Sequence, residues 1–190
     1  MTCMKVKSIK ILNINLAPFP PLTTDRLLLR KLTVDDRHEL LQLRSDAIVN
    51  TYLGRPNDIT IDDIDAYINK IVSLYLKNDC AYWAISLKDD PRLIGAICLW
   101  NFVPEEDKAE IGYELRPAYH GQGYMQEAIT KVIDYGFNSM RLKVITALPN
   151  PENKKSVTLL ERNHFQLDLD YKYVDREGAG EQAVYFLINK

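Results

Sequence analysis

The stretch from Glu110 to Ala128 reads EIGYELRPAYHGQGYMQEA, and it decides the fold because it joins a strand pattern to a glycine loop that opens an amphipathic helix. The glycines at positions 121 and 123 allow backbone conformations and close approaches that a Cβ atom would block. Several consecutive N–H groups can then point at one anion. The following helix adds unpaired N-terminal donors and the positive end of its dipole. The stretch therefore predicts a cradle for a pyrophosphate group.

The sequence after the loop predicts a β-α-β unit. Residues 110–115 give the first strand, residues 123–137 a helix and residues 143–148 the second strand. A second signal lies downstream, where Asn153-Lys154-Lys155-Ser156 opens another helical run that ends near Asn163. The glycine loop therefore lies between a strand and a helix, which is the context that a phosphate-binding loop needs.

Together, the loop and the segment from Asn153 to Ser156 resemble the GNAT acyltransferases. In that superfamily the coenzyme A loop reads roughly Gln/Arg-x-x-Gly-x-Gly/Ala, and the next helix often begins Asn-x-x-Ser. The opening LTTDRLLLR of residues 22–30, the IGY of residues 111–113 and the GQGY of residues 121–124 resemble the RimJ/RimL-like branch, whose acceptors include protein N-termini, polyamines, amino acids and antibiotics. The resemblance spans about residues 22–189. Ala118 stands at the first position of the loop motif, and His164 stands where a glycine is usual.

The resemblance implies an α/β fold with a GNAT-like mixed, mostly antiparallel central sheet, splayed central strands and flanking helices. The parting strands would be residues 110–115 and 143–148, with the pantetheine arm of acetyl-CoA, the implied co-substrate, between them. A backbone N–H of the first strand would polarise the thioester carbonyl, and loss of such a donor typically costs about 3 kcal/mol. The residues expected to bind the cofactor are Leu115, His120, Gly121, Gln122, Gly123, Tyr124, Met125 and Asn153.

Two residues are candidates for catalysis. Amine attack on a thioester needs a neutral amine, a stabilised oxyanion and a proton for the departing thiolate. Glu110 begins the strand where many GNAT relatives place a base, although it could also be a solvated strand-end glutamate, and Glu114 shares its face by strand alternation. Many relatives use a tyrosine on the helix after the second splayed strand as the general acid. Residues 157–160 offer none, which leaves Ser156 as the nearest hydroxyl; Ser156 could equally cap its helix or touch the cofactor.

Composition and charge argue against several other classes of protein. A chain of 190 residues with 46% apolar content fits one domain, and its formal charge of −2 supplies no broad basic field for nucleic acid. No 18-residue apolar run exists, and the N-terminal segment lacks a continuous apolar core, so we expect neither a membrane span nor a secretory signal. Cysteines 3, 80 and 98 show no spacing that suits a metal or a disulfide framework. These features predict a cytoplasmic protein without a metal site, and Cys98 is expected to be a small core residue.

The pattern along the chain predicts an N-terminal extension over residues 1–21 and an acetyltransferase domain over residues 22–190. Prolines 18, 20 and 21 suit an extended connector at the end of the extension. Thr33 and Thr60 are predicted to cap two helices. The elements expected in addition to those above are a strand at 26–32, helices at 33–44 and 61–77, a hairpin of strands 82–87 and 93–102, and final strands at 165–174 and 183–188.

The sequence predicts an acetyl-CoA-dependent N-acetyltransferase whose leading acceptor is a protein N-terminal α-amine. Small-molecule amines such as polyamines, aminoglycosides or amino acids are the next acceptor class. A catalytically silent acyl-CoA sensor is the alternative from another class, and a homodimer is compatible with the family. Five aromatic residues could shape an acceptor pocket, although aromatic side chains in such elements more often belong to the core. They are Tyr52, Tyr82, Trp83, Trp100 and Tyr113.

Overall fold

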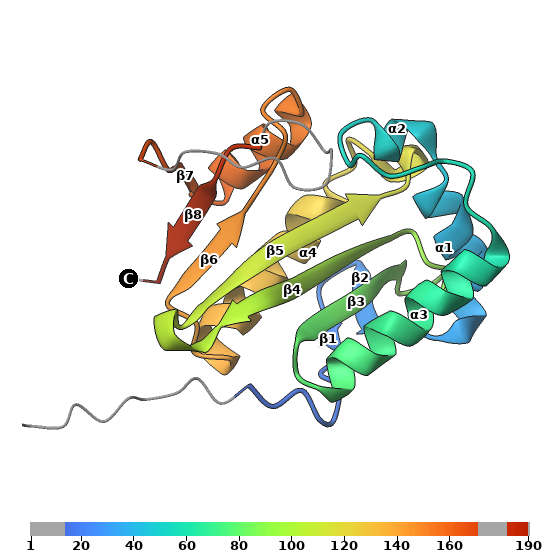
Figure 1. The fold of residues 1–190 in the computed structure, drawn as a ribbon, viewed down its shortest axis with the longest axis horizontal. Helices are drawn as coiled ribbons and strands as arrows, with labels where there is room; N and C mark the ends of the chain where they lie inside the picture. Colours follow the sequence, from blue (N-terminus) through green and yellow to red (C-terminus); the bar gives the residue numbers. More distant parts are fainter. Residues whose placement is uncertain (1–13, 171–181, 190) are drawn as a thin grey trace, which may run out of the picture.

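One mixed sheet organises the protein. The computed structural model describes residues 14–170 and 182–189. Within that part of the chain, eight strands follow the order β1-β2-β3-β4-β5-β6-β8-β7, and every neighbouring pair is antiparallel except β5 and β6 (Figure 1). The strands are β1 Leu22–Thr23, β2 Leu27–Lys31, β3 Cys80–Leu87, β4 Gly95–Val103, β5 Lys108–Leu115, β6 Val144–Ala147, β7 Gln166–Leu167 and β8 Tyr185–Ile188.

Helices cover both faces of this sheet. Figure 1 shows α3 in front of the sheet and α4 behind it. The α-helices are α1 Arg37–Arg44, α2 Ala47–Asn50, α3 Ile61–Leu76, α4 Tyr124–Asp134 and α5 Lys154–Arg162. Short 3-10 turns precede α1 (η1, Val34–Asp36), link β4 to β5 (η2, Pro104–Glu106) and begin the glycine loop (η3, Pro117–Tyr119), and a π-helical segment follows α4 (η4, Tyr135–Ser139).

The two faces of the sheet bury two apolar clusters because side chains alternate along each strand. On the α4 side, Trp83, Ile97 and Ile111 pack with residues of α4 and α5. On the α3 side, Tyr82 and Ala96 pack with residues of α1 and α3. The sheet therefore separates two apolar clusters, one on each of its faces.

The N-terminal segment that the structure describes lies against the domain. Leu16 is buried, and its amide donates to Oδ1 of Asn78 (2.9 Å). The indole N–H of Trp83 donates to the carbonyl of Pro20 (2.7 Å), and the Phe19 ring lies 5.8 Å from the Trp83 ring. Residues 14–21 of the predicted extension are therefore packed on the α4-side core.

Most predicted elements are confirmed, and the differences have physical causes. The predicted helix at 33–44 begins as η1 before it becomes α1. The predicted helix at 123–137 leaves α-geometry after Asp134, where Gly136 approaches the sheet so closely that a Cβ would lie 3.1 Å from the Ile145 side chain. The strand predicted at 165–174 is limited to β7 in the described part, and residues 171–174 lie outside it.

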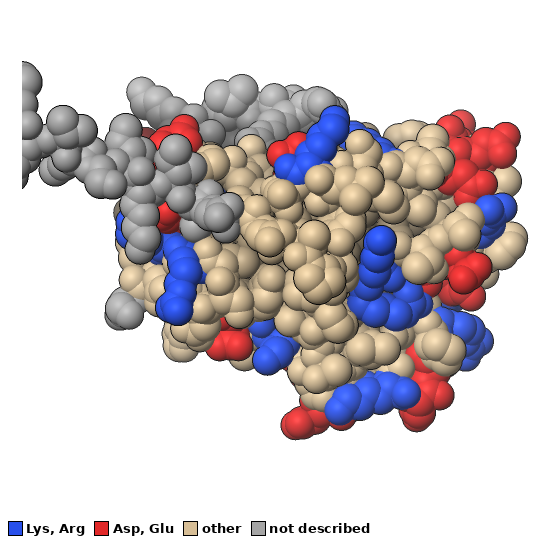
Figure 2. All heavy atoms as spheres, turned by 90° about the horizontal axis from the view of Figure 1, so that it is seen from below, with Lys and Arg blue, Asp and Glu red and all other residues tan. Residues whose placement is uncertain are grey.

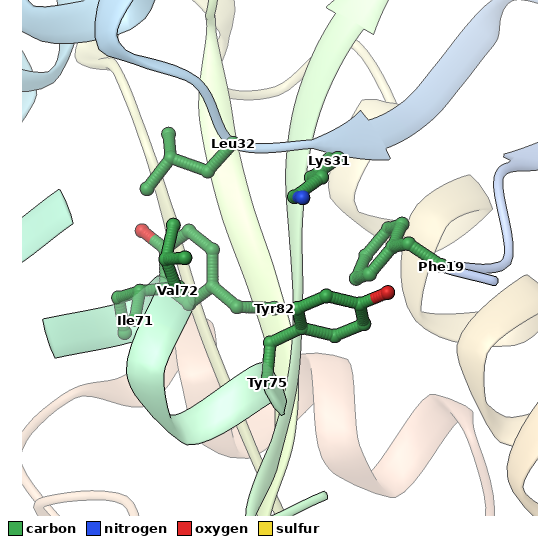
Figure 3. A pocket seen from close by; sticks show the side chains of 7 residues that line it. All are labelled: Phe19, Lys31, Leu32, Ile71, Val72, Tyr75 and Tyr82. Atoms are coloured by element: carbon green, nitrogen blue, oxygen red, sulfur yellow. The ribbon is translucent and has the colours of Figure 1, made fainter. Parts of the chain in front are cut away.

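A small cavity lies between β2, β3 and the end of α3. Its volume is about 10 Å³, roughly that needed for one water molecule. Figure 3 shows Phe19, Tyr75 and Tyr82 around it, with the Lys31 side chain beside them. Tyr82 is the one candidate for the acceptor pocket that lines this cavity, and none of the residues predicted for catalysis or cofactor binding does.

Gly95→Ala is expected to lower the free energy of unfolding by about 1–3 kcal/mol, the usual cost of overpacking a core. A Cβ on Gly95 would lie 2.6 Å from the backbone carbonyl of Glu114 and 2.8 Å from the Leu115 side chain. Urea unfolding of the variant beside Ser73→Ala, a change on the exposed side of α3, measures the effect. Equal midpoints for Gly95→Ala and the wild type would contradict the close approach.

Candidate functional site

The glycine loop has the backbone geometry that the sequence predicts. Gly121 and Gly123 both adopt positive φ angles, +74° and +80°, and Gly123 is the N-cap of α4. The amide of Glu127 donates to the carbonyl of Gly123 (3.0 Å). The first amides of α4 precede this bond and have no partner inside the helix, so they can receive an anion.

A brace from the β1–β2 turn holds the loop. Nη1 of Arg26 donates to the carbonyl of Gln122 (3.0 Å), and its Nε donates to Oε2 of Glu127 in α4 (2.7 Å). The backbone amide of Arg26 and the hydroxyl of Thr24 bind the other oxygen of Glu127. The guanidinium also lies over the Tyr124 ring, 4.4 Å from its centroid. No local pattern in the sequence indicates this brace, because its partners lie about a hundred residues apart.

Glu127→Gln is expected to remove a pH-dependent part of the stability. Burial alone would raise the pKa of Glu127, but the hydrogen bonds from Thr24 and from the amide and guanidinium of Arg26 bring it below its ordinary value. A lowered pKa in the folded state means that the ionised carboxylate stabilises the fold at pH values above about 4.3, the usual unfolded value. This contribution disappears as the pH falls from there through the folded-state pKa.

Urea unfolding of the wild type and the Glu127→Gln variant at a series of pH values measures this effect. The difference in free energy of unfolding should be largest near neutral pH and should shrink below about pH 4. A difference that is independent of pH would show that the loss is one of packing and not of charge.

The parallel strands β5 and β6 separate next to the loop. They pair only at Lys108, Ala109 and Glu110, where Glu110 lies opposite Thr146. Figure 1 shows the two strands diverging beyond this point, while β5 continues to pair with β4 as far as Leu115. The predicted parting of strands 110–115 and 143–148 is therefore present.

His120 connects the loop to the end of the separated strand. Its ring Nε2 donates to the carbonyl of Leu115 (2.8 Å), and its backbone amide donates to the carbonyl of Pro117 (3.0 Å). Two predicted cofactor residues, Leu115 and His120, are thus in direct contact. The ring of His120 therefore has a structural role that the sequence did not indicate.

Glu110 lies at the fork itself. Only 7% of the residue is exposed, so it is not a solvated strand-end glutamate. Nδ2 of Asn101 donates to its Oε2 (3.2 Å). Asn101 has a φ of +49° and belongs to an irregularity in the β4–β5 pairing between Trp100 and Val103. The irregularity therefore brings an amide group to the carboxylate.

Ser156 and Asn153 meet at the start of α5, on the β6 side of the fork. Oδ1 of Asn153 accepts the backbone amide of Ser156 (3.1 Å), so Asn153 caps the helix and the alternative of Ser156 as the cap is wrong. The Ser156 hydroxyl lies 2.9 Å from the hydroxyl of Tyr113 in β5. The sequence suggests Tyr113 only as part of an acceptor pocket, because nothing in its strand indicates a contact with a helix 43 residues away.

Glu114 lies on the same α3-side face as Glu110, and two arginines bind its carboxylate. Its carboxylate oxygens lie 2.8 Å from Nη2 of Arg55 and 3.5 Å from Nη1 of Arg44. The Arg44 guanidinium stacks 3.7 Å from the centroid of the Tyr67 ring. Arg55 precedes α3, so Glu114 anchors that loop to the end of β5. This arrangement suits a wall of the site better than a proton-transfer group.

The candidate groups on β5 lie on two opposite faces of the sheet. Glu110 and Glu114 lie on the α3-side face, together with Gly112, whose absent Cβ leaves room beside the Cys98 thiol. Tyr113 points to the other face and meets Ser156. A ligand in the fork between β5 and β6 would therefore have a carboxylate on one side and two hydroxyls on the other.

Within residues 14–170 and 182–189, no group of three or more His, Cys, Asp or Glu residues could hold a metal ion. No helix in the same ranges is long and apolar enough to cross a membrane. Figure 2 shows charged residues of both signs dispersed over one face, with uncharged surface between them.

Comparison with known proteins agrees with this geometry. Residues 26–166 match the Acetyltransferase (GNAT) domain family. The chain is 34% identical over 167 residues to the N-acetyltransferase YoaA of Bacillus subtilis, covering 88% of this chain and 89% of that protein. It is 27% identical over 165 residues to the ribosomal protein uS5-alanine N-acetyltransferase of Escherichia coli, covering 81% and 84%.

A solved structure supports the fold independently. The spermidine N-acetyltransferase from Vibrio cholerae, in complex with CoA and spermine, superposes with a TM-score of 0.72 at 21% identity and covers 85% of this chain and 95% of its own. The predicted α/β fold and the predicted resemblance to ribosomal-protein acetyltransferases are confirmed. With a family match over most of its length, the chain belongs to the GNAT acetyltransferases and is an N-acetyltransferase of that type.

Proposed function

We propose that the protein transfers the acetyl group of acetyl-CoA to the α-amine of a protein N-terminus. The observation that carries the proposal is the fork between β5 and β6, which opens beside a braced glycine loop at the start of α4. The acceptor class is supported by the similarity to the ribosomal protein uS5-alanine N-acetyltransferase of Escherichia coli.

The cofactor would lie along the loop and enter the fork. The amides from Gly121 to Met125 would bind the pyrophosphate at the positive end of α4. The pantetheine arm would pass between Leu115 and Asn153, whose side-chain carbonyl is already used by the helix cap. Nδ2 of Asn153 makes no hydrogen bond to the described part of the chain and would donate to a pantetheine carbonyl.

The residues at the fork would perform acyl transfer. Glu110 would take a proton from the attacking amine, and a backbone N–H of the separated part of β5 would stabilise the oxyanion. Ser156 would donate a hydrogen bond to the departing thiolate. An α-amine has a reference pKa near 8 and lysine one near 10.4, so an N-terminal amine needs less help from a base at neutral pH.

Small-molecule amines are the second acceptor class. The solved spermidine N-acetyltransferase shares this fold, which shows that the fold can accommodate such an acceptor. The catalytically silent sensor is less well supported, because the fork contains a buried carboxylate and a partly buried pair of hydroxyls. Neither arrangement is needed for cofactor binding alone.

The decisive test is thiol release from acetyl-CoA by the purified protein. The acceptors are peptides with free N-termini, the same peptides with blocked N-termini and a free lysine, polyamines, aminoglycosides and amino acids, with product masses recorded. Acetylation of free N-termini alone supports the proposal, whereas acetylation of another class replaces the acceptor. Acetyl-CoA binding without release above hydrolysis across the panel would favour the sensor.

A further inference from the structure

We infer that Tyr113 is a positioning residue, whose hydroxyl orients the Ser156 hydroxyl toward the sulfur of coenzyme A. The inference rests on the proposed function, in which Ser156 faces the departing thiolate. It assigns a role in the site to a β5 side chain on the face opposite Glu110. No loop or helix motif in the sequence identifies that side chain.

The contact spans the two arms of the fork. Tyr113 lies in the part of β5 that has no β6 partner, and α5 follows β6 in the chain. The Tyr113 hydroxyl lies 2.9 Å from Oγ of Ser156 and 3.5 Å from the Ser156 carbonyl. Asn153 fixes the backbone of Ser156 from the other direction. The serine is therefore held by both its backbone and its side chain, at the mouth of the gap that the cofactor would enter.

The inference requires Tyr113 to be the hydrogen donor, since either hydroxyl could donate across the 2.9 Å contact with Ser156. Burial raises the pKa of Tyr113 to about 12, although the hydrogen bond with Ser156 opposes this rise, so the phenol keeps its proton at neutral pH. When Tyr113 donates that hydrogen to Oγ of Ser156, the serine hydrogen must point elsewhere. Oγ of Ser156 has no other hydrogen-bond partner in the described part of the chain. In that arrangement the serine O–H is left for a ligand.

The chemistry needs such a donor at the sulfur. The amine nitrogen forms its bond to the thioester carbonyl carbon, and the C–S bond breaks with its electron pair passing to sulfur. The amine proton passes to Glu110 and then to water. A thiol has a pKa of about 8.5, so the thiolate leaves readily and needs a hydrogen bond more than a full proton from serine. Ser156 supplies that bond while Tyr113 remains protonated, and the thiolate takes a proton from water on release.

The test is the acidity of the coenzyme A thiol when it is bound to the full-length protein. Ultraviolet absorbance of the thiolate is followed against pH for bound CoA, with S-methyl-CoA as the blank for tyrosine and cysteine absorbance. Tyr113→Phe is expected to lower the acid dissociation constant of the bound thiol about threefold to tenfold, the range of one hydrogen bond. Ser156→Ala should lower it at least as much. The double variant should show little change beyond Ser156→Ala, because the two residues act through one contact.

Tyr135→Phe is the matched control. It also removes a partly buried hydroxyl, on the π-helical segment after α4, and should leave the bound thiol unchanged. A merely structural role for Tyr113 would lower stability without changing the thiol acidity, and that result would overturn the inference. Additive effects in the double variant would do the same. If Tyr113→Phe does not fold, an unchanged thiol in Ser156→Ala contradicts the inference, and a lowered acidity that Ser156→Thr restores supports it.

Failure of the proposed function is distinguishable from failure of the inference. A protein that binds CoA but acetylates no acceptor still allows the thiol titration. A protein that shows the predicted changes in thiol acidity but transfers no acetyl group would contradict the proposed function and support the role of Tyr113. A protein that transfers the acetyl group, but whose variants leave the acidity of the bound thiol unchanged, would support the proposed function and contradict the role of Tyr113.

Discussion

Glu110→Gln is expected to lower turnover at neutral pH by about a hundredfold or more, the usual contribution of a general base, while acetyl-CoA affinity stays unchanged. The amide has nearly the same shape as the carboxylate, so the buried position and the contact with Asn101 can be retained. Single-turnover transfer and acetyl-CoA binding are measured separately. Glu105→Gln, at an exposed position in η2, is the control for removal of one negative charge nearby.

The pH profile of Glu110→Gln adds a second outcome. Without a base, the amine must lose its proton to water before attack, so the deficit should shrink as the pH rises through the pKa of the acceptor. That recovery should occur near pH 8 for an N-terminal α-amine and above about pH 10 for a lysine-like amine. The same variant therefore reports on the acceptor class. Unchanged turnover at neutral pH would exclude Glu110 from the mechanism.

Gly123→Val is expected to weaken acetyl-CoA binding by about tenfold or more. A β-branched residue at a φ of +80° is a strained outlier that costs roughly 1–3 kcal/mol, so the loop should leave the cradle conformation. A Cβ there would also lie 3.4 Å from the Arg26 guanidinium and disturb the brace. Isothermal titration with acetyl-CoA measures the dissociation constant.

Gly54→Val is a matched control for this change. Gly54 also has a positive φ, +60°, but it lies in the exposed turn after α2, distant in sequence from the glycine loop. It should impose a similar local strain and leave acetyl-CoA affinity unchanged. Equal losses for Gly54→Val and Gly123→Val would indicate a general loss of stability, and unchanged binding in Gly123→Val would remove the loop from the cofactor site.

Local signals explain why much of the fold could be predicted from sequence. Thr60 and Asp63 form a capping box that starts α3 where expected, and both glycines of the loop adopt positive φ angles. The limits of β7 could not be predicted in this way. Leu169 is apolar and suggested a continuing strand, yet it is 87% exposed and lies beyond the residues that pair with β8.

The site was predictable where one segment carries its own geometry and not where tertiary contacts complete it. The glycine loop follows from spacing along the chain. The Arg26 brace, the arginine pair on Glu114 and the Tyr113–Ser156 contact each join residues far apart in sequence. Strand alternation correctly placed Glu114 beside Glu110, but alternation carries no information about which charges meet it from another element.

The two tryptophans of the chain lie on opposite faces of one sheet, and they therefore form a pair of independent optical reporters. Trp83 is fully buried under Phe19 and Pro20, so its emission should respond to release of the N-terminal segment. Trp100 is 40% exposed and lies opposite Glu110 in the β4–β5 pairing. Its emission should respond to an acceptor arriving at the α3-side face. Each single replacement by phenylalanine would leave one reporter, which makes the two events separable in one intact protein.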